Sequence, residues 1–481
     1  MRRLTKQDQS GIALPIQLIC SWIRSPVVNK PNQIIKRVLN YGIIATLGLL
    51  AVSGRSAETN GTANPSQAEL AAQILADQTF REVHQMAQKL LKGGFNAGSG
   101  YGEVWIRDLN TFIGVALEVS PPQRFREALL TFFKFQGTNG DVVDGYIPLD
   151  LAKAKYAYRT SSLAHDLMAH KNTVETDQES SLVQAVRKYV LATHDETILQ
   201  ERIAGITVRD RLGQALQYVL TERFDREHGL IWGGTTADWG DVQPESSWGV
   251  ALDANSHRAL SIYDNAMLVI ALNDYLQLLG ANDPDAGRWT TTRDELKQNI
   301  RRYLWDAKKQ KFIPHVYLTG SPFPKDFDEN AIYYHGGTAV AIEAGLLTHE
   351  EVARSLEQME ANVRSAGAAS IGLALYPPYP EGFFKNPQMR HPYSYQNGGD
   401  WCWFGGRMIQ DLVREGDIAE AYRDLRPMVE RVKRTGGFYE WWSLDNQPRG
   451  SGEYRGSAGV LGQAIEMLQT WAEQSTGVRR P

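Results

Sequence analysis

The stretch YDNAMLVIALNDYLQLLG, residues 263–280, repeats apolar side chains at intervals of three and four residues, which is the spacing of one face of an α-helix. Ser261 stands where a helix N-cap is expected, and Gly280 stands where such a helix would stop. The same periodicity recurs at residues 67–91, 125–136, 177–193, 208–223, 291–306, 337–347, 349–363, 403–416, 417–437 and 456–474. The pattern predicts roughly a dozen helices, with Asp177 and Thr348 as further N-caps and Gly416 as a further stop.

Strand signals are scarce, and no long run of Gly, Ser or Pro separates the predicted helices. A length of 481 residues by itself suggests two or three domains, but the unbroken helical pattern favours one large domain over residues 67–481. Short turns alternate with long, aromatic, glycine-rich loops. We therefore expect an all-α toroid in which six inner helices are surrounded by six outer ones.

The first 56 residues differ from the rest of the chain. Residues 1–40 hold seven basic side chains and a single acid, Asp8, and the apolar run YGIIATLGLLAVSG follows at residues 41–54. Such a run fits a secretory signal better than a full membrane span. We expect residues 1–56 to be a signal peptide, with a membrane anchor as the alternative, and residues 57–66 to be a linker. We therefore expect the protein to be exported to the periplasm or secreted.

Composition excludes several classes of partner. The formal net charge is −4 with no basic run beyond residue 40, so nucleic acid is not an expected partner, and a membrane is expected only through the N-terminal segment. Cys20 and Cys402 are the two cysteines, so a chain without its leader can form no internal disulfide. No H-x-x-x-H or C-x-x-C spacing occurs, and neither a metal nor an organic cofactor is expected.

Tryptophan is concentrated in four short segments. Eight of the 12 tryptophans lie in residues 101–113, 229–249, 391–408 and 436–459, each of which also contains a carboxylate and glycines. Aromatic faces stack on sugar rings while carboxylates and amides bind hydroxyl groups, so this mixture predicts a carbohydrate pocket. The alternative is that the tryptophans pack a core and the carboxylates cap helices.

Two carboxylates in these segments could cleave a glycosidic bond. The reaction needs one carboxylic acid to protonate the leaving oxygen and one carboxylate on the anomeric side. Asp241 and Glu440 are the candidates, with Asp238 as the rival acid and Glu453 as the rival base. Inversion would require about 6.5–9.5 Å between the two carboxyl groups, with room for water.

Neighbouring residues would support these two groups. Trp239, Trp441 and Trp442 would form apolar walls that raise a carboxyl pKa. Arg107 and Asp108 suit sugar hydroxyls, with Arg107 holding Asp108 charged, and a local salt bridge between them is the alternative.

Four motifs carry a resemblance to known enzymes. Trp105-Ile106-Arg107-Asp108 resembles the W-x-R-D signature of (α/α)6-barrel glycoside hydrolases, and Ala237 to Asp241 is similar to the A-D-W-N-D segment of cellobiose phosphorylase. Asn397 to Trp401 resembles the N-G-G-x-W motif of invertases and glucoamylase-like enzymes. Tyr439 to Trp442 is similar to the P-E-Y-Y-D segment of invertases. The resemblance implies a six-hairpin glycosidase with Asp241 as general acid and Glu440 as second catalytic carboxylate. No single family matches all four motifs, since Gly240 replaces the phosphorylase asparagine.

We therefore expect an exo-acting, inverting glycosidase that acts on a small oligosaccharide or glycoside. The residues expected to bind its substrate are Trp105, Arg107, Asp108, Asp144, Asp177, Asp238, Trp239, Tyr395, Gln396, Asn397, Gly398, Trp401, Trp441 and Tyr454. Three alternatives stay open: a glycoside phosphorylase that binds phosphate near Arg449 and Arg455, a non-catalytic carbohydrate-binding protein, and a lyase using Tyr334 and His335. Asp177 could equally be a helix cap.

Overall fold

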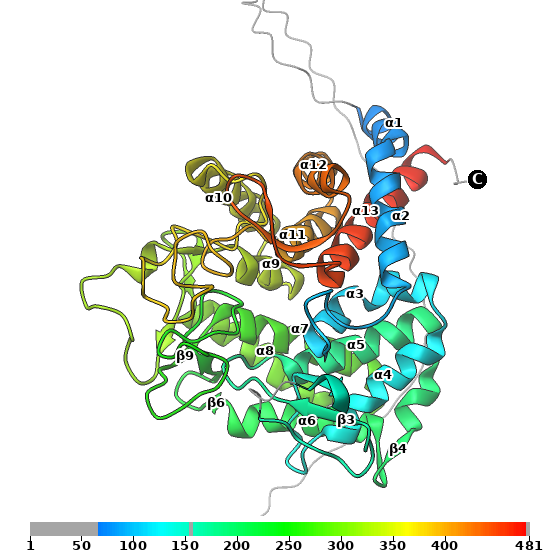
Figure 1. Ribbon diagram of the computed structural model, residues 1–481, viewed down its shortest axis with the longest axis vertical. Helices are drawn as coiled ribbons and strands as arrows, with labels where there is room; N and C mark the ends of the chain where they lie inside the picture. The colour runs from blue at the N-terminus through cyan, green and yellow to red at the C-terminus, as the bar shows by residue number, and fades with distance from the viewer. Residues whose placement is uncertain (1–65, 153–156, 478–481) are drawn as a thin grey trace, which may run out of the picture. The chain divides into compact units, whose positions relative to one another are not determined.

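The computed structural model describes residues 66–152 and 157–477, which belong to one compact unit. Figure 1 shows that α-helices make up most of this unit. Within the described ranges there are 13 of them: α1 (Gln67–Ala76), α2 (Gln78–Leu91), α3 (Ile106–Val119), α4 (Pro122–Phe135), α5 (Gln178–Thr193), α6 (Val208–Glu222), α7 (Ile262–Leu279), α8 (Ala286–Tyr303), α9 (His335–Glu343), α10 (His349–Ala366), α11 (Cys402–Glu415), α12 (Ile418–Thr435) and α13 (Arg455–Thr476). The expectation of a mostly helical fold is confirmed, although short strands occur in the loops.

Side-chain caps mark the start of five of the 13 described helices, α1, α2, α6, α7 and α10. Thr348 forms a capping box with Glu351 at the start of α10, and the Ser261 side chain accepts a hydrogen bond from the backbone of Asp264 at the start of α7. The single helix expected over residues 67–91 is wrong, because Asp77 ends α1 and caps α2 through the backbone N–H groups of Thr79 and Phe80. Apolar periodicity did not predict helix α3.

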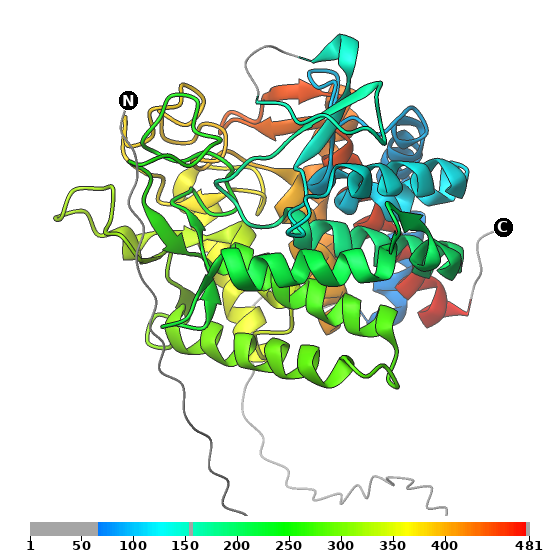
Figure 2. The same ribbon diagram turned by 90° about the horizontal axis from the view of Figure 1, so that it is seen from below.

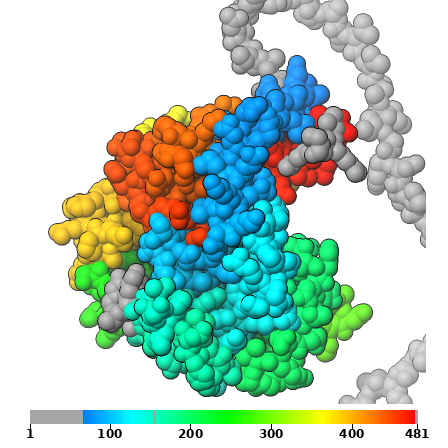
Figure 3. Space-filling view, turned by 45° about the vertical axis from the view of Figure 1, so that its right-hand side comes forward, coloured from blue at the N-terminus to red at the C-terminus, as the bar shows by residue number. Residues whose placement is uncertain are grey.

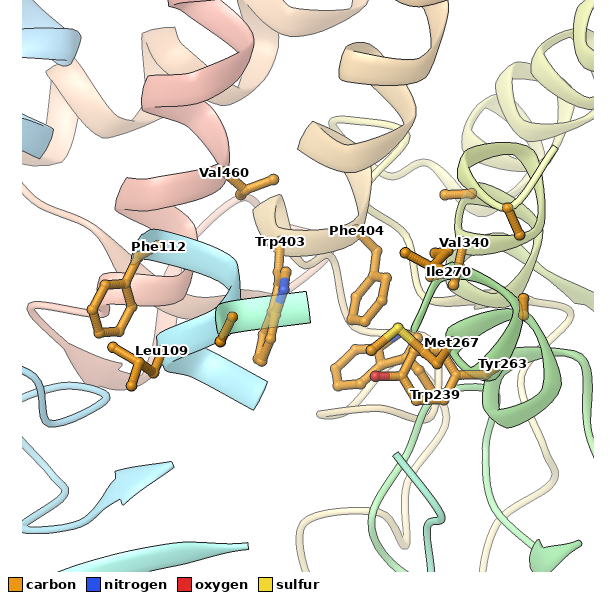
Figure 4. Close-up of a cluster of buried hydrophobic side chains, with 14 of the residues drawn as sticks. Leu109, Phe112, Trp239, Tyr263, Met267, Ile270, Val340, Trp403, Phe404 and Val460 are labelled. Atoms are coloured by element: carbon orange, nitrogen blue, oxygen red, sulfur yellow. The ribbon is translucent and has the colours of Figure 1, made fainter. Parts of the chain in front are cut away.

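Six helices form a closed ring. Helices α3, α5, α7, α9, α11 and α13 each contact the next one in this order, and α13 contacts α3. Helices α2, α4, α6, α8, α10 and α12 alternate with them in sequence and pack outside, each against one or both of its sequence neighbours in the ring. Figure 4 shows the middle of the ring, where Phe112 of α3, Met267 of α7, Val340 of α9, Phe404 of α11 and Val460 of α13 form an apolar core.

The connections differ in length at the two ends of the helices. Turns of two to six residues lead from α3, α7, α9 and α11 to the following outer helix, whereas 14 to 42 residues precede each inner helix. Apart from the β4–β5 pair before α6, these long loops contain all of the short strands within the described residues. Figure 2 shows loops and strands gathered on one side of the helices.

The strands form small antiparallel sheets. Two sheets have three strands: β1 (Val104–Trp105), β2 (Gly145–Pro148) and β3 (Leu167–His170) in that order, and β12 (Val316–Tyr317), β9 (Arg258–Leu260) and β8 (Gly233–Gly234) in that order. The others are the pairs β4 (Arg202–Ile203) with β5 (Ile206–Thr207), β6 (Phe224–Asp225) with β7 (Leu230–Ile231), β10 (Trp305–Asp306) with β11 (Lys311–Phe312), β13 (Tyr333–Tyr334) with β14 (Leu375–Tyr376), and β15 (Tyr439–Trp442) with β16 (Pro448–Gly452).

The ring closes where the two ends of the domain meet. Figure 3 shows the N-terminal helices, in blue, against the C-terminal helix, in red, and α13 contacts α1, α2 and α3. Gly459 of α13 lies directly against the backbone of Phe112 in α3, and a Cβ atom there would overlap Phe112. The backbone N–H of Arg455 donates to the carbonyl of Ala97, and that of Ser99 to the carbonyl of Gly452. Close helix contact therefore joins residues separated by more than 300 positions.

The expectations for the signal or anchor at residues 1–56 and for the linker at 57–66 concern residues almost wholly outside the described range, of which only Ser66 is included. No helix in residues 66–152 and 157–477 has both the length and the apolar character needed to cross a membrane.

The closure contact gives a stability prediction. Gly459→Ala forces a methyl group into the backbone of Phe112, and overpacking of this kind costs about 1–3 kcal/mol. Gly287→Ala is the matched control, because Gly287 lies in helix α8 with open space around its Cβ position, and Ala stabilises an exposed helix by up to about 1 kcal/mol. Urea unfolding should show a lower midpoint for Gly459→Ala and an unchanged or higher one for Gly287→Ala. Equal midpoints for the two variants would contradict the tight closure.

Candidate active site

A cavity of about 440 Å³ opens among the long loops that precede the inner helices. The N-cap residues of α3, α11 and α13, which are Trp105, Trp401 and Tyr454, line it directly. Of the residues predicted from the sequence, those that line the cavity are Trp105, Arg107, Asp108, Asp144, Trp239, Asp241, Tyr395, Gln396, Trp401, Glu440 and Tyr454. The fold thus brings all four tryptophan-rich segments to one place.

Glu440 lies in β15 and is buried. Its Oε1 accepts hydrogen bonds from the Tyr101 hydroxyl at 2.7 Å and the Tyr395 hydroxyl at 3.3 Å, and its Oε2 accepts one from the Ser451 N–H at 2.8 Å. Burial raises the pKa of Glu440, and these three hydrogen bonds oppose that increase. Gly450 has a φ of 69°, and a Cβ there would overlap the Glu440 carboxylate. A glycine is therefore required beside this carboxylate.

Asp241 is partly exposed and lies in the loop that follows strand β8. Gln396 Nε2 donates to Asp241 Oδ1 at 2.8 Å, and Asn172 Nδ2 donates to the Asp241 carbonyl at 3.0 Å. No described residue donates a hydrogen bond to the second carboxyl oxygen, Oδ2. This oxygen of Asp241 can therefore face a ligand. Asp241 and Glu440 therefore line the same cavity, each with an anchored carboxyl group.

Arg107 favours the charged form of Asp108, as expected, but its ion pairs are with other carboxylates. Its guanidinium contacts Asp177 Oδ2 at 2.6 Å and Glu175 Oε1 at 3.0 Å. Burial raises the pKa of Asp108 to about 7, against the opposing influence of Arg107 and of a hydrogen bond from Tyr454. Asp108 is thus close to half protonated at neutral pH and can both donate and accept a hydrogen bond.

Burial affects two further groups in the cavity. It raises the pKa of Asp144 to about 8 and lowers the pKa of His170 to about 4, so both are mainly uncharged at neutral pH. Arg107 is the single arginine among the described residues that line the cavity, and no lysine lines it. With two carboxylates on its guanidinium, Arg107 has little positive charge to offer a ligand.

The tryptophans contribute more to packing than the sequence suggested. Trp239 and Trp401 are each 1% exposed and meet edge to face at 4.7 Å, while Trp239 stacks on Phe404 at 4.3 Å. Figure 4 shows Trp239 beneath Phe404 in the apolar core. Trp442 is fully buried against the guanidinium of Arg431. Both interpretations of the tryptophan-rich segments therefore apply, since Trp239 and Trp401 pack the core and also border the cavity.

Five residues predicted to bind substrate do not line the cavity. Asp177 is fully buried, and its carboxylate accepts hydrogen bonds from Arg107 and from the Tyr263 hydroxyl, the latter at 2.7 Å. Its side chain makes no capping hydrogen bond to α5. Asp238 accepts from the N–H groups of Gly336 and Gly337 at the start of α9.

The other three shape the loop before α11. Asn397 is buried and bonds Tyr379 through both side-chain atoms, Gly398 has a φ of 88°, and Trp441 packs on Tyr395. These five residues position neighbours of the cavity instead of lining it.

Several lining residues were not singled out from the sequence. Tyr101, Glu103, His170, Trp248, Asn386, Gln388 and Ser451 are among them, whereas Asn172 and Glu175 lie in the loop at residues 171–178 that the sequence already suggested for the pocket. Tyr101, Glu103 and Trp248 lie inside the tryptophan-rich segments, so the composition of those segments already indicated their neighbourhood. Nothing in the sequence predicts the contact between Ser451 and Glu440.

The residues behind the alternative functions lie elsewhere. Arg449 is exposed and Arg455 donates to the carbonyl of Asn96, and neither lines the cavity. The rival base Glu453 is exposed. Tyr334 bonds the Tyr379 hydroxyl and His335 bonds Asn362, and both are buried outside the cavity.

A group with metal-ligand chemistry lies away from the cavity. His84, Glu118 and Glu466, on α2, α3 and α13, have ligand atoms within 4.8 Å of one another. None of the three lines the cavity.

Solved structures with this fold include several glycosidases. An uncharacterized conserved protein from Thermus thermophilus is 16% identical with a TM-score of 0.58, covering 79% of this chain and 99% of its own. The GH63 mannosylglycerate hydrolase from the same organism, in complex with glucose, is 15% identical with a TM-score of 0.57, covering 82% and 100%. A rhamnosidase from Klebsiella oxytoca with rhamnose bound is 14% identical with a TM-score of 0.53, covering 81% and 64%. A search of curated proteins found no match.

The family comparison is more specific. The model of the glycosyl hydrolase 94 superfamily, catalytic domain, matches residues 83–412, more than half of the chain. The match includes Asp241 and the motifs around Arg107 and Asn397, and it agrees with the resemblance to six-hairpin glycosidases. On this evidence the chain belongs to the glycosyl hydrolase 94 superfamily and carries its catalytic domain.

Proposed function

We propose that this protein is an exo-acting glycoside hydrolase that cleaves a small oligosaccharide or glycoside with inversion of configuration. Asp241 is the general acid that protonates the leaving oxygen, and Glu440 is the base that activates water. The observation that carries the proposal is that both carboxyl groups line one cavity of about 440 Å³, each anchored by hydrogen bonds from other segments.

The anchoring suits the two roles. Gln396 holds one oxygen of Asp241 and leaves the other to contact the glycosidic oxygen. Three donors favour the charged form of Glu440, which is the form that can accept a proton from water. Asp108, with its pKa near 7, can donate to or accept from a sugar hydroxyl deep in the cavity.

Phosphorolysis is the second candidate, because the segment around Asp241 resembles that of cellobiose phosphorylase. The charge of the cavity supports hydrolysis instead. Six carboxyl groups line it, of which burial keeps Asp144 mainly and Asp108 partly uncharged at neutral pH. Arg107 is the single arginine among the described lining residues, and it is already paired with two carboxylates. A phosphate dianion would approach the carboxylates that stay charged and would find no unpaired lysine or arginine among the described lining residues.

An assay with and without phosphate separates the two reactions. Purified protein from residue 67 onward is screened against α- and β-linked gluco-, manno- and galacto-oligosaccharides, and NMR identifies the first anomer released. We expect equal rates at 0 and roughly 10 mM phosphate, an inverted free sugar and no sugar phosphate. Turnover that requires phosphate would overturn the hydrolase proposal.

Asp241→Asn tests the general acid and the non-catalytic alternative together. The amide keeps the size of the side chain but cannot donate the required proton, so we expect kcat to fall about 10²- to 10⁴-fold while calorimetry shows sugar affinity retained. Asp253→Asn, on an exposed aspartate later in the same loop, is the matched control and should keep wild-type kcat. An Asp241→Asn variant with normal turnover would remove Asp241 from the mechanism.

Tyr101→Phe tests the base through the pH profile. Glu440 acts in its deprotonated form, so kcat/KM falls as pH drops below its pKa. Loss of the 2.7 Å bond from Tyr101 destabilises that charged form, and about 1.5 kcal/mol corresponds to about one pH unit.

We therefore expect the acidic limb of the kcat/KM profile to move upward by about one unit in Tyr101→Phe. Tyr395→Phe should move it less, since that bond is 3.3 Å long. An acidic limb that stays in place, or moves to lower pH, in Tyr101→Phe would contradict the role of Glu440.

Export belongs to the proposal as well, and it rests on the basic lead and the apolar run within residues 1–56. Mass spectrometry of the protein recovered from each cell fraction tests it.

A further inference from the structure

Two residues that contact the proposed catalytic carboxyl groups are neighbours in the sequence. The Tyr395 hydroxyl donates to Glu440 Oε1 at 3.3 Å, and Gln396 Nε2 donates to Asp241 Oδ1 at 2.8 Å. Both donors are buried. One short stretch of the loop before α11 therefore contacts the proposed acid and the proposed base at the same time.

The backbone of this stretch has an unfavourable conformation. Tyr393 has a φ of 60°, Tyr395 has a φ of 50° and Gly398 has a φ of 88°. The left-handed region is costly for tyrosine, because its Cβ atom comes too close to a backbone carbonyl oxygen. Such a conformation persists only where the surrounding contacts hold it in place. The positions of Tyr395 and Gln396 therefore depend on what holds the loop.

The side chain of Asn397 holds it. Asn397 is fully buried, and its Oδ1 accepts a hydrogen bond from the Tyr379 N–H at 2.8 Å. Its Nδ2 donates to the carbonyls of Tyr379 at 3.1 Å and Met389 at 3.2 Å. Aspartate cannot replace this amide, because its second carboxyl oxygen would face two carbonyl oxygens. The loop is thus bound to the backbone of two other segments through one side chain.

Tyr379 is itself fixed by a buried carboxylate. Its hydroxyl donates to Glu329 Oε1 at 2.7 Å and lies 2.5 Å from the Tyr334 hydroxyl. Glu329 also accepts from the Tyr317 hydroxyl at 2.8 Å, and His315 Nδ1 lies 3.0 Å from it. Burial raises the pKa of Glu329, but His315 and the hydrogen bonds outweigh burial and leave that pKa below its usual value. Both the hydroxyl and the backbone of Tyr379 are therefore held.

We propose that Asn397, held by this anchored tyrosine, is a positioning residue that sets the general acid and the base together. It acts through the two residues before it, since Gln396 contacts Asp241 and Tyr395 contacts Glu440. The proposal rests on the hydrolase function above for the roles of the two carboxyl groups. A change at Asn397 should affect both groups at once, although Asn397 does not line the cavity.

The pH profile distinguishes this role from a general loss of stability. Hydrolysis needs Glu440 in its charged form and Asp241 in its protonated form. Withdrawal of Tyr395 raises the pKa of Glu440 further, because a donor to the carboxylate is lost, and the acidic limb of kcat/KM then moves upward. Withdrawal of Gln396 removes a donor from the charged form of Asp241, so the basic limb moves upward as well.

The other ionisable groups whose charge acts on these two carboxyl groups are Tyr101, Arg107, Asp108, Asp144, Glu175 and Tyr454. All six line the cavity and are unchanged in the variants below.

The test measures kcat/KM against pH for wild type, Asn397→Ala, Gln396→Leu and Asn265→Ala, on the substrate found in the screen. Asn265 is the matched control, because it is equally buried and also binds one backbone, that of Ile231, through both side-chain atoms. Its remaining hydrogen bond goes to the Ser261 carbonyl, and it does not line the cavity.

We expect both limbs of Asn397→Ala to move upward by roughly 0.5–1 pH unit, and kcat to fall about 10- to 100-fold as the carboxyl groups lose their alignment. Gln396→Leu should move the basic limb alone. Asn265→Ala should lower the urea midpoint without moving either limb. The proposal is overturned if Asn397→Ala moves neither limb or only one, if the basic limb of Gln396→Leu stays in place, or if Asn265→Ala moves both limbs equally.

Tyr379→Phe decides the question if Asn397→Ala does not fold. This change removes only the hydroxyl that bonds Glu329 and Tyr334, and it keeps the backbone bonds to Asn397. We expect both limbs to move upward by a smaller amount, because the anchor of Asn397 is loosened. Limbs that stay in place in Tyr379→Phe would overturn the role of the anchor.

Hydrogen exchange separates failure of the positioning role from failure of the hydrolase function. The N–H groups of Asn397 and Gly399 donate to the carbonyls of Ser394 and Tyr395, each at 2.9 Å. Peptides within residues 393–401 should exchange about tenfold faster in Asn397→Ala and at the wild-type rate in Asn265→Ala. If wild type turns over nothing, the hydrolase function fails. Faster exchange in Asn397→Ala still supports the positioning role, and unchanged exchange overturns it.

Discussion

The contact between α13 and α3 is the constraint on which the active site depends. Gly459 lets the two helices approach to backbone contact, and the adjoining loops then pair, with Arg455 donating to Ala97. This pairing brings Tyr101 to Glu440, although 339 positions separate them. A ring that failed to close would leave the buried carboxylate of Glu440 without the hydrogen bond from Tyr101.

The ring also directs its helix N-termini to one place. The N-caps of α3, α11 and α13 line the cavity. The starts of α5, α7 and α9 lie behind its wall, where Asp177 bonds Arg107 and Tyr263, and where Asp238 accepts from the first N–H groups of α9. Each N-terminus carries a partial positive charge and unsatisfied N–H groups. Helix N-termini of this kind favour carboxylates near them.

The sequence predicted the helices well because apolar periodicity is a local property, and 11 of the predicted segments overlap helices of the structure. It also identified 11 residues that line the cavity, since the long loops share an unusual composition. It was wrong about the partner of Arg107, because Asp177 and Glu175 come from another loop. It overrated Trp239 as a stacking surface, since composition does not distinguish a buried indole from an exposed one.

The sequence by itself determined the helical class, the alternation of short turns with long loops, and the four segments that hold the candidate site. These depend on neighbouring residues and on composition. The tertiary structure alone decided which side chains meet: Tyr101 with Glu440, Gln396 with Asp241, and Arg107 with Asp177. It also decided that Trp401 is 1% exposed while Trp248 is 37% exposed. The physical reason is that pairing and burial are set by the closing of the ring, which no local stretch of sequence encodes.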